Sequence, residues 1–178
     1  MEQADVDIEE ELGLLDAVLG RFEALRAAGP EKLGVRVGSV SGWSVEQHLY
    51  HIALATDLAF RNVRALATRK GRLIVEEGEL RADAVDVLVN RVTKRGAAEA
   101  PRMVRPDDEV DPELLTLELG RMREGLEGLR GIRGEIHSAP HWIPHQILGP
   151  LGAAHWLRFA TMHAAHHLAI VDDVLDAS

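Results

Sequence analysis

The stretch His163-Ala-Ala-His-His167 lies inside a longer amphipathic segment, 151–175, and decides how the rest of the chain is interpreted. Apolar and histidine side chains repeat there at alternating steps of four and three residues, which is the spacing of the buried side of a bundled helix. The repeating positions are Trp156, Ala160, His163, His167, Ile170 and Val174. Two imidazoles therefore stand where leucine or isoleucine is expected. A buried imidazole left without hydrogen-bond partners costs about 1–3 kcal/mol, so the pair needs an explanation, and a divalent metal is the most economical one.

Length and composition favour one helical domain that spans residues 1–178. Aromatic residues make up only 4% of the chain, while Leu, Ala and Val are abundant, which favours helices over a β-sandwich. A net charge of −9 without a basic run argues against a nucleic-acid partner. We also expect no membrane span and no signal peptide, because no apolar run is long enough and the N-terminus is acidic, and hence a cytoplasmic protein.

The chain contains no cysteine, which excludes disulfides, thiolate metal ligands and a cysteine nucleophile. Any thiol used in a reaction would have to come from a small cosubstrate.

Apolar periodicity predicts three more long helices and one short one. The predicted helices run, in chain order, from Asp5 to Ala28, from Ser44 to Lys70-Gly71, from Arg81 to Arg95 (short), from Asp111-Pro112 to the glycines at 128–134, and over 151–175. Residues 71–109 are expected to form a long connection over one end of the molecule, and residues 135–152 a loop rich in Pro, Gly and His. Four long amphipathic segments predict an all-α fold, a four-helix bundle with a short extra helix.

The start of the second long helix carries the next group of histidines. Ser44 and Gln47 have the spacing of a capping box. Trp43 lies just outside the cap, and His48 occupies the position of its hydrophobic staple partner. His51 lies one turn further along, so either histidine could reach the core.

His163 and His167 are one turn apart and could chelate one ion, with metal–nitrogen distances of about 2.0–2.1 Å for zinc. A third imidazole must come from another helix, and His48 is the preferred candidate. Three histidines leave a coordination position open to water or substrate, as catalytic sites do. Two alternatives to this ligand set remain, with His51 in place of His48 or His166 in place of His167. A third alternative is a metal-free site in which the histidines are only hydrogen-bonded.

Other chemistry-bearing motifs are missing. Ala164 follows His163, so there is no HExxH motif with a built-in glutamate base. Glu46 and Asp57, the acidic residues nearest to His48, are interpreted as solvated helix-surface groups. The remaining histidines are interpreted as partly exposed loop residues, namely His137, His141, His145 and His155.

Three quoted segments together resemble the DinB/YfiT-like superfamily: Trp43-Ser-Val-Glu-Gln-His48-Leu, His163-Ala-Ala-His-His167-Leu, and the run from His145 to Phe159. The last one is similar to that superfamily's HP-x-FG-x-L…WL-x-F pattern, with Gln146 in place of the usual proline. The resemblance implies a four-helix bundle with one long crossover connection. By motif position it also implies a divalent metal held by His48, His163 and His167.

Members of that superfamily bind nickel, zinc or iron and are often homodimers. They include thiol-dependent S-transferases and a mycothiol-dependent isomerase, and many others are described as metal-dependent hydrolases. The resemblance gives no reason to expect DNA binding. We therefore expect a metal-dependent enzyme that activates a small thiol or water, and the alternative is a non-catalytic metal-binding or ligand-sensing module.

Overall fold

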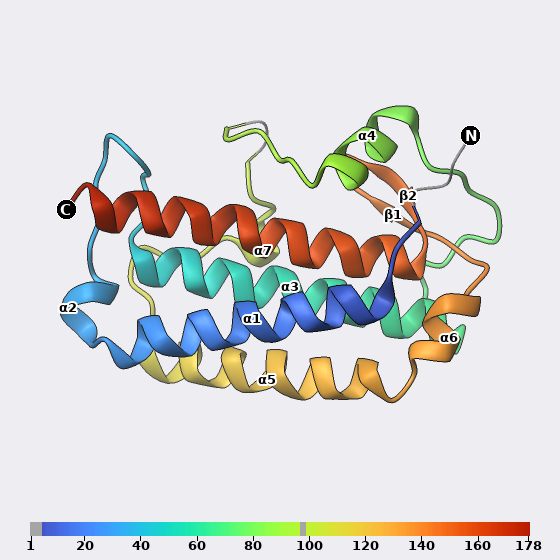
Figure 1. The fold of residues 1–178 in the computed structure, drawn as a ribbon, viewed down its shortest axis with the longest axis horizontal. Helices are drawn as coiled ribbons and strands as arrows, with labels where there is room; N and C mark the ends of the chain where they lie inside the picture. Colours follow the sequence, from blue (N-terminus) through green and yellow to red (C-terminus); the bar gives the residue numbers. More distant parts are fainter. Residues whose placement is uncertain (1–4, 97–98) are drawn as a thin grey trace.

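Four long helices form the body of the molecule and lie side by side (Figure 1). The computed structural model describes residues 5–96 and 99–178. The long helices are α1 (Ile8–Ala27), α3 (Val45–Thr68), α5 (Pro112–Arg130) and α7 (Ala153–Asp176). The prediction of an all-α fold is confirmed, apart from one small hairpin.

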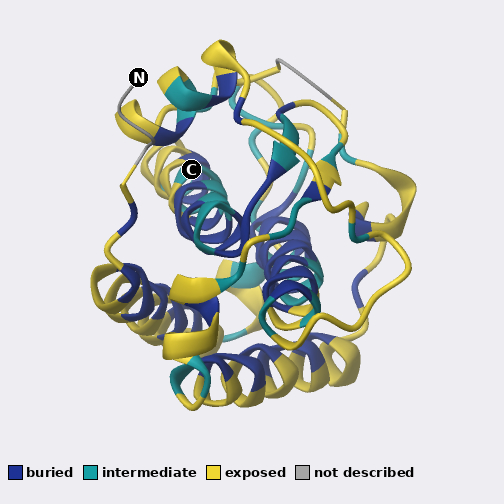
Figure 2. Ribbon diagram, turned by 90° about the vertical axis from the view of Figure 1, so that its right-hand side faces the viewer, coloured by how far each residue is buried: buried dark blue, intermediate teal, exposed yellow. Residues whose placement is uncertain are grey.

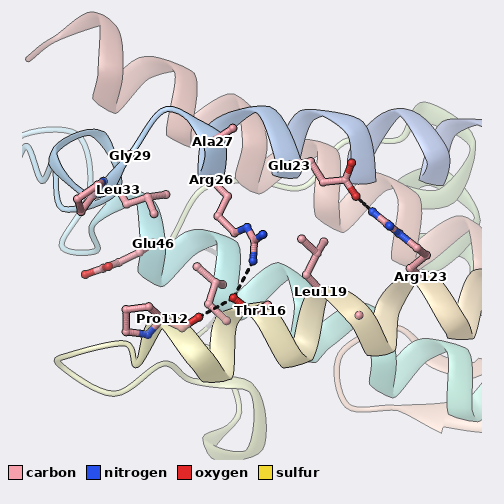
Figure 3. A pocket seen from close by; sticks show the side chains of 13 residues that line it. Glu23, Arg26, Ala27, Gly29, Leu33, Glu46, Pro112, Thr116, Leu119 and Arg123 are labelled. Carbon is pink, nitrogen blue, oxygen red and sulfur yellow. Dashed lines mark hydrogen bonds and ion pairs between the residues drawn. The ribbon is translucent and has the colours of Figure 1, made fainter.

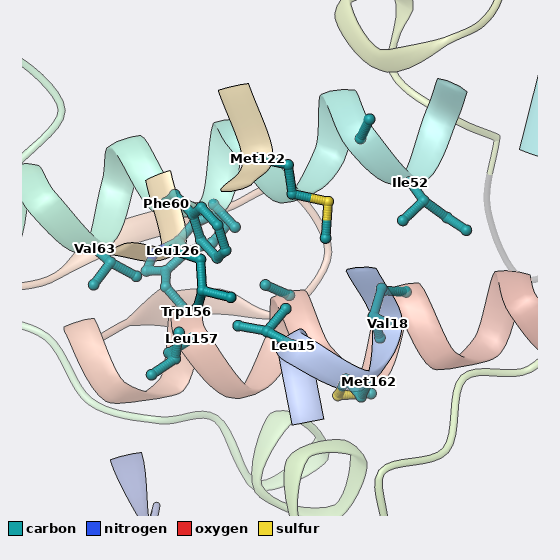
Figure 4. Packing of buried hydrophobic residues seen from close by; sticks show 14 of the residues in the cluster. Leu15, Val18, Ile52, Phe60, Val63, Met122, Leu126, Trp156, Leu157 and Met162 are labelled. Atoms are coloured by element: carbon teal, nitrogen blue, oxygen red, sulfur yellow. The ribbon is translucent and has the colours of Figure 1, made fainter. Parts of the chain in front are cut away.

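The four helices surround a common apolar core. Helix α3 packs most extensively against α7 and next against α5, while α1 contacts both α7 and α5 on the other side. Viewed from the end, the helices turn buried faces inward and exposed faces outward (Figure 2). Phe60, Leu126 and Leu157 from α3, α5 and α7 are almost fully buried and lie in this core (Figure 4). Within the described ranges, no helix combines the length and apolarity needed to cross a membrane.

Helices α1 and α7 run in one direction along the molecule, and α3 and α5 run in the other (Figure 1). Because α3 and α5 are consecutive among the long helices, the chain between them must return along the length of the molecule. That connection contains α4 (Ala82–Asn90) and the short helix η1 (Arg102–Val104). The connection covers the predicted segment 71–109, but it runs back along the molecule and does not lie over one end only, because α3 and α5 run in the same direction.

Helix boundaries differ from the prediction where a cap sets them. The first helix begins at Ile8 and not at Asp5, because the Asp7 side chain accepts a hydrogen bond from the Glu10 amide at 3.1 Å. The short helix ends at Asn90 and not at Arg95, because Arg91 takes a left-handed conformation with φ 52°. The capping box at Ser44 and Gln47 is confirmed.

The segment predicted as a loop, 135–152, contains regular structure. It holds part of α6 (Arg133–Ser138) and an antiparallel hairpin of β1 (Ile143–His145) and β2 (Gly149–Leu151). Gly149, with φ 76°, supports the hairpin turn. An isolated bridge between Val75 and Trp142 ties the hairpin to the long connection. A further short helix, α2 (Pro30–Leu33), follows α1 and was not predicted.

A buried carboxylate fixes the long connection to the helices. Glu11 of α1 is 0% exposed and is bonded to Arg91 at 2.5 Å and to Arg158 of α7 at 2.8 Å. Arg158 also donates to the Asp5 carbonyl at 3.0 Å. The two guanidinium groups compensate the charge of the carboxylate, which burial alone would make very unfavourable.

Replacing Glu11 with alanine is expected to lower the free energy of unfolding by about 3–5 kcal/mol, since it leaves the buried Arg158 guanidinium with only the exposed Glu10 carboxylate, 4.0 Å away. Urea unfolding followed by circular dichroism measures this change. The matched control is Glu9→Ala in the same helix turn, whose exposed ion pair with Arg133 should contribute less than about 1 kcal/mol. Equal effects from the two variants would contradict the structural role of Glu11.

Candidate metal centre

Histidines from α3 and α7 meet where these two helices pack together. One ligand nitrogen from each of His51, His163 and His167 lies within 4.8 Å of the other two. The packing of α3 against α7 is the most extensive helix contact of the described chain, so the position of the group is set by the core itself. Three imidazoles from two rigid helices form a site that could hold a metal ion.

The closest nitrogens have the spacing that a shared metal requires. His51 Nε2 and His163 Nε2 are 3.2 Å apart. Two nitrogens that each lie about 2.0–2.1 Å from one ion are about 3.3 Å apart in tetrahedral geometry and about 2.9 Å apart at right angles. The observed spacing falls between these limits, so this pair fits a divalent ion without movement of the helices.

The orientation of His51 is fixed by the long connection. Its Nδ1–H donates to the Val104 carbonyl at 2.7 Å, at the end of η1. In a neutral imidazole this bond places the lone pair on Nε2, which is the nitrogen that faces His163. An outer hydrogen bond of this kind is the usual partner of a metal-ligating histidine.

The same connection is also attached to the beginning of α3. Gln47 donates from its side-chain amide to the carbonyls of Asp107 at 2.8 Å and Asp108 at 3.3 Å. Gln47 and His51 of α3 therefore both bind the long connection and hold it against the histidine group.

His48 adjoins the three-histidine group without joining it. Its Nδ1 is 3.1 Å from His167 Nδ1, and its Nε2 is 2.8 Å from Ser41 Oγ. Sequence reasoning preferred His48 to His51 as the third ligand beside His163 and His167. The structure brings His163 and His167 together and places His51 with them. A ligand role for His48 stays a prediction.

Local sequence pattern does not distinguish these two histidines, because the start of α3 is buried nearly all round. His48 and His51 are each 2% exposed. Helices α7, α5 and α6 and the short η1 all contact α3. The feature that distinguishes His51 is its hydrogen bond to the Val104 carbonyl. Because Val104 belongs to a distant segment, the sequence around His51 does not reveal this bond.

Trp43 packs over the histidines as the predicted staple. Its ring centroid lies 5.3 Å from His48, 5.0 Å from His51 and 6.1 Å from His167. The contact with His48 confirms the staple prediction. The indole limits the access of water to one side of the group.

Burial makes these imidazoles poor bases. It lowers the pKa of His48 to about 4 and that of His163 to about 3, with smaller contributions from neighbouring positive charge. It also lowers the pKa values of His51 and His167 below their ordinary range. All four rings are therefore neutral near pH 7, and neutral imidazole is the form that binds metal.

One side of the group is open. His163 and His167 are half-buried, whereas His51 is buried. His166 lies beside His167, with ring centroids 5.2 Å apart, but does not belong to the group. Burial lowers the pKa values of His48 and His166, and the positive charge of Arg95 lowers both by a smaller amount. Arg95 is itself paired with Asp173 of α7 at 2.5 Å, so the open side is bordered by an ion pair.

The remaining histidines lie outside the group. His145 is half-buried in β1, where its Nδ1 accepts from the amides of Ile147 and Leu148 at 3.2 and 3.1 Å. His155 lies in the first turn of α7 and not in a loop, and its Nδ1 accepts from the Gly152 amide. His137 is exposed, and His141 is half-buried with a buried Nδ1 that has no hydrogen-bond partner among the described residues.

The two acidic residues considered from sequence are also outside the group. Glu46 is half-buried, and burial raises its pKa. Asp57 pairs with Arg61 at 2.5 Å. Neither carboxylate belongs to the histidine group.

A surface hollow lies away from the histidine group. It has a volume of about 810 Å³ and is bordered by α1, α2, α5 and Glu46 of α3 (Figure 3). Two pairs of its polar side chains contact each other, Arg26 with Thr116 and Glu23 with Arg123. No histidine lines it, so we place the candidate site at the histidine group.

A family model described as a protein of unknown function, DUF1569, matches residues 11–173. The chain belongs to the DUF1569 family. The matched range includes His51, His163 and His167, together with all of α3 and α5 and most of α1 and α7. No curated protein and no solved structure matches this DUF1569 chain.

The metal-free DUF1569 protein is expected to lose stability as the pH falls from about 6.5 towards 4. The pKa values of the buried histidines are lower in the folded chain than their ordinary value of 6.5. In this range the unfolded chain binds protons that the folded chain does not, so the free energy of unfolding decreases with falling pH. Urea unfolding in the presence of chelator at pH 7 and pH 5 measures the effect.

His145 offers an internal check because it lies outside the metal group and its pKa is lowered to about 4. The variant His145→Gln should show a pH dependence shallower by about one proton over the same range. An unchanged slope would mean that this histidine is protonated equally in the folded and unfolded chains.

Proposed function

We propose that this DUF1569 protein is a metal-dependent enzyme related to the DinB-like superfamily. The observation that carries the proposal is the group of three neutral imidazoles, His51, His163 and His167, on the packed faces of α3 and α7. Buried histidines of this kind need partners, and one divalent ion satisfies three lone pairs at once. The half-buried state of His163 and His167 supports a position open to a ligand.

The arrangement of the long helices supports the same relationship. Helices α1 and α7 run opposite to α3 and α5, and a long connection returns between α3 and α5 (Figure 1). This is the order of a four-helix bundle with one long crossover connection. We propose that the chain is such a bundle, with α4 as the short extra helix and residues 1–178 as one domain.

A metal bound at this site would supply Lewis acidity, which lowers the pKa of a thiol or water near it. The protein residues have separate tasks. His51, His163 and His167 would hold the ion, Trp43 would exclude water from one side, and the ion pair of Arg95 with Asp173 would border the opening.

The residues around the site favour thiol chemistry over hydrolysis. Among the residues that the structure describes, no carboxylate belongs to the histidine group to act as a general base for water. The chain also has no cysteine of its own. The proposed reaction is therefore S-transfer with a low-molecular-weight thiol as cosubstrate, and hydrolysis is the second possibility. We propose nickel, zinc or iron as the metal, a cytoplasmic location and a homodimer, as in the superfamily.

One observation favours a non-catalytic alternative. His48 Nδ1 lies 3.1 Å from His167 Nδ1, close enough for a small ring movement to bring a fourth imidazole to the ion. A site with four protein ligands would be closed, as structural and sensing sites are. In that case the protein would bind a metal or sense it without catalysis.

The metal content of the protein, purified without a histidine tag, distinguishes these possibilities. We expect near one divalent ion per chain by plasma mass spectrometry, and its loss from His51→Ala, His163→Ala and His167→Ala, because each removal leaves only two imidazoles. The matched control is His137→Ala, which removes an exposed histidine outside the group and should keep the metal.

His48→Ala decides between the two possible third ligands. Retention of stoichiometric metal in this variant supports the set with His51, and its loss together with retention in His51→Ala supports the set predicted from sequence. Wild-type protein that takes up no metal after reconstitution with nickel, zinc or iron would contradict the proposed function.

The metal-loaded protein is expected to join the sulfur of a small thiol to an electrophilic carbon. The new carbon–sulfur bond replaces the bond to a leaving group, and the thiol proton passes to solvent. Disappearance of thiol is followed with a panel of low-molecular-weight thiols and electrophilic acceptors, at matched concentrations of loaded protein, chelated protein and His163→Ala. A rate that depends on both metal and His163 supports an enzyme. A loaded protein that leaves every pair unreacted would favour the binding or sensing module.

A further inference from the structure

We propose that His48 is a positioning residue, which together with Ser41 forms an outer hydrogen-bonded chain that orients His167 towards the metal. The inference rests on the proposed metal site and assigns His48 a role other than that of a ligand. It starts from the two contacts of His48, one with His167 at 3.1 Å and one with Ser41 at 2.8 Å.

Both nitrogens of His48 are already engaged. Its Nδ1 faces His167 and its Nε2 faces Ser41 Oγ. If His167 binds the metal through Nε2, a ligand role of His48 through Nδ1 would leave the buried Nδ1–H of His167 without an acceptor, at a cost of about 1–3 kcal/mol. His48 is 2% exposed, so water cannot replace the lost partner. The packing thus favours His48 as a partner of a ligand.

The protons can be assigned without conflict along the chain. A neutral His167 that keeps its proton on Nδ1 donates to His48 Nδ1, which leaves Nε2 of His167 for the metal. His48 then carries its own proton on Nε2 and donates to Ser41 Oγ. Ser41 Oγ also accepts from the Trp43 amide at 3.1 Å, which holds the hydroxyl oxygen in place. Each neutral ring then carries one proton. The lone pair of His48 accepts the hydrogen bond from His167, and the lone pair of His167 is left for the metal.

His51 shows the same arrangement on the opposite side of the group. Its Nδ1 donates to the Val104 carbonyl at 2.7 Å and leaves Nε2 for the metal. Imidazole ligands in proteins are generally held by such an outer acceptor, and its loss weakens metal affinity about 10–100-fold. For His167 the outer acceptor is an imidazole of the same chain.

The test is a titration of chelated protein with Co²⁺, which reports affinity through competition with a chelator and ligand number through its visible absorption. His48→Leu removes the acceptor for His167, and His48→Asn restores an oxygen acceptor near the position of Nδ1. We expect His48→Leu to bind one Co²⁺ per chain about 10–100-fold more weakly than wild type, with an unchanged absorption spectrum. His48→Asn should recover most of the affinity.

Two further variants separate a positioning role from a general loss of structure. Ser41→Ala removes the outer acceptor and should weaken Co²⁺ binding less than His48→Leu does. His51→Leu removes a ligand and should abolish stoichiometric binding. Thermal unfolding of each chelated variant shows whether it folds, and a folded Ser41→Ala or His48→Asn protein suffices for the comparison.

Two outcomes would overturn the inference while the metal site stands. Unchanged Co²⁺ affinity in His48→Leu would mean that His48 does not position His167. Loss of the site in both His48 variants, with a retained site in His51→Leu, would make His48 a ligand. Wild-type protein that binds no Co²⁺ is a third and separate outcome, which removes the proposed function together with this inference.

Discussion

The contact between α3 and α7 is the constraint on which the site depends. These helices pack most extensively of all, and the contact buries His48 and His51 from one helix against His163 and His167 from the other. Trp43 packs against three of these rings and Phe159 against that of His163, and these contacts help to remove the rings from water. Desolvation keeps the imidazoles neutral, and neutral imidazoles at this spacing have lone pairs that must be satisfied by one another, by backbone carbonyls or by an ion.

The long connection between α3 and α5 contributes more than a covalent link. At one point Arg91 forms an ion pair with the buried Glu11. At another, the Val104 carbonyl accepts a hydrogen bond from His51. Gln47 then binds the carbonyls of Asp107 and Asp108, just before α5 begins. A segment with little regular structure is thereby fixed over the histidine group, where it determines the tautomer of one ring and forms an ion pair with α7 through Arg95 and Asp173.

The long helices could be predicted from sequence because their apolar periodicity is local, and the capping box at Ser44 could be read for the same reason. The end of α4 could not, since the left-handed Arg91 is held by an ion pair with Glu11, eighty residues away in sequence. The strands at 143–145 and 149–151 are three residues long, and the bridge from Trp142 to Val75 beside them comes from another segment. Too little local pattern exists to predict them.

The site shows the same division between local and distant information. His163 and His167 lie one turn apart on one helix face, so their pairing follows from the sequence alone. The choice between His48 and His51 depends on Val104 and Ser41, which approach the rings from outside the helix. Anomalous diffraction from crystals of the metal-loaded protein would locate the ion. We expect one anomalous peak between α3 and α7, bonded to nitrogens of His51, His163 and His167. A peak bound by surface carboxylates, or no ordered peak in fully reconstituted protein, would contradict this expectation.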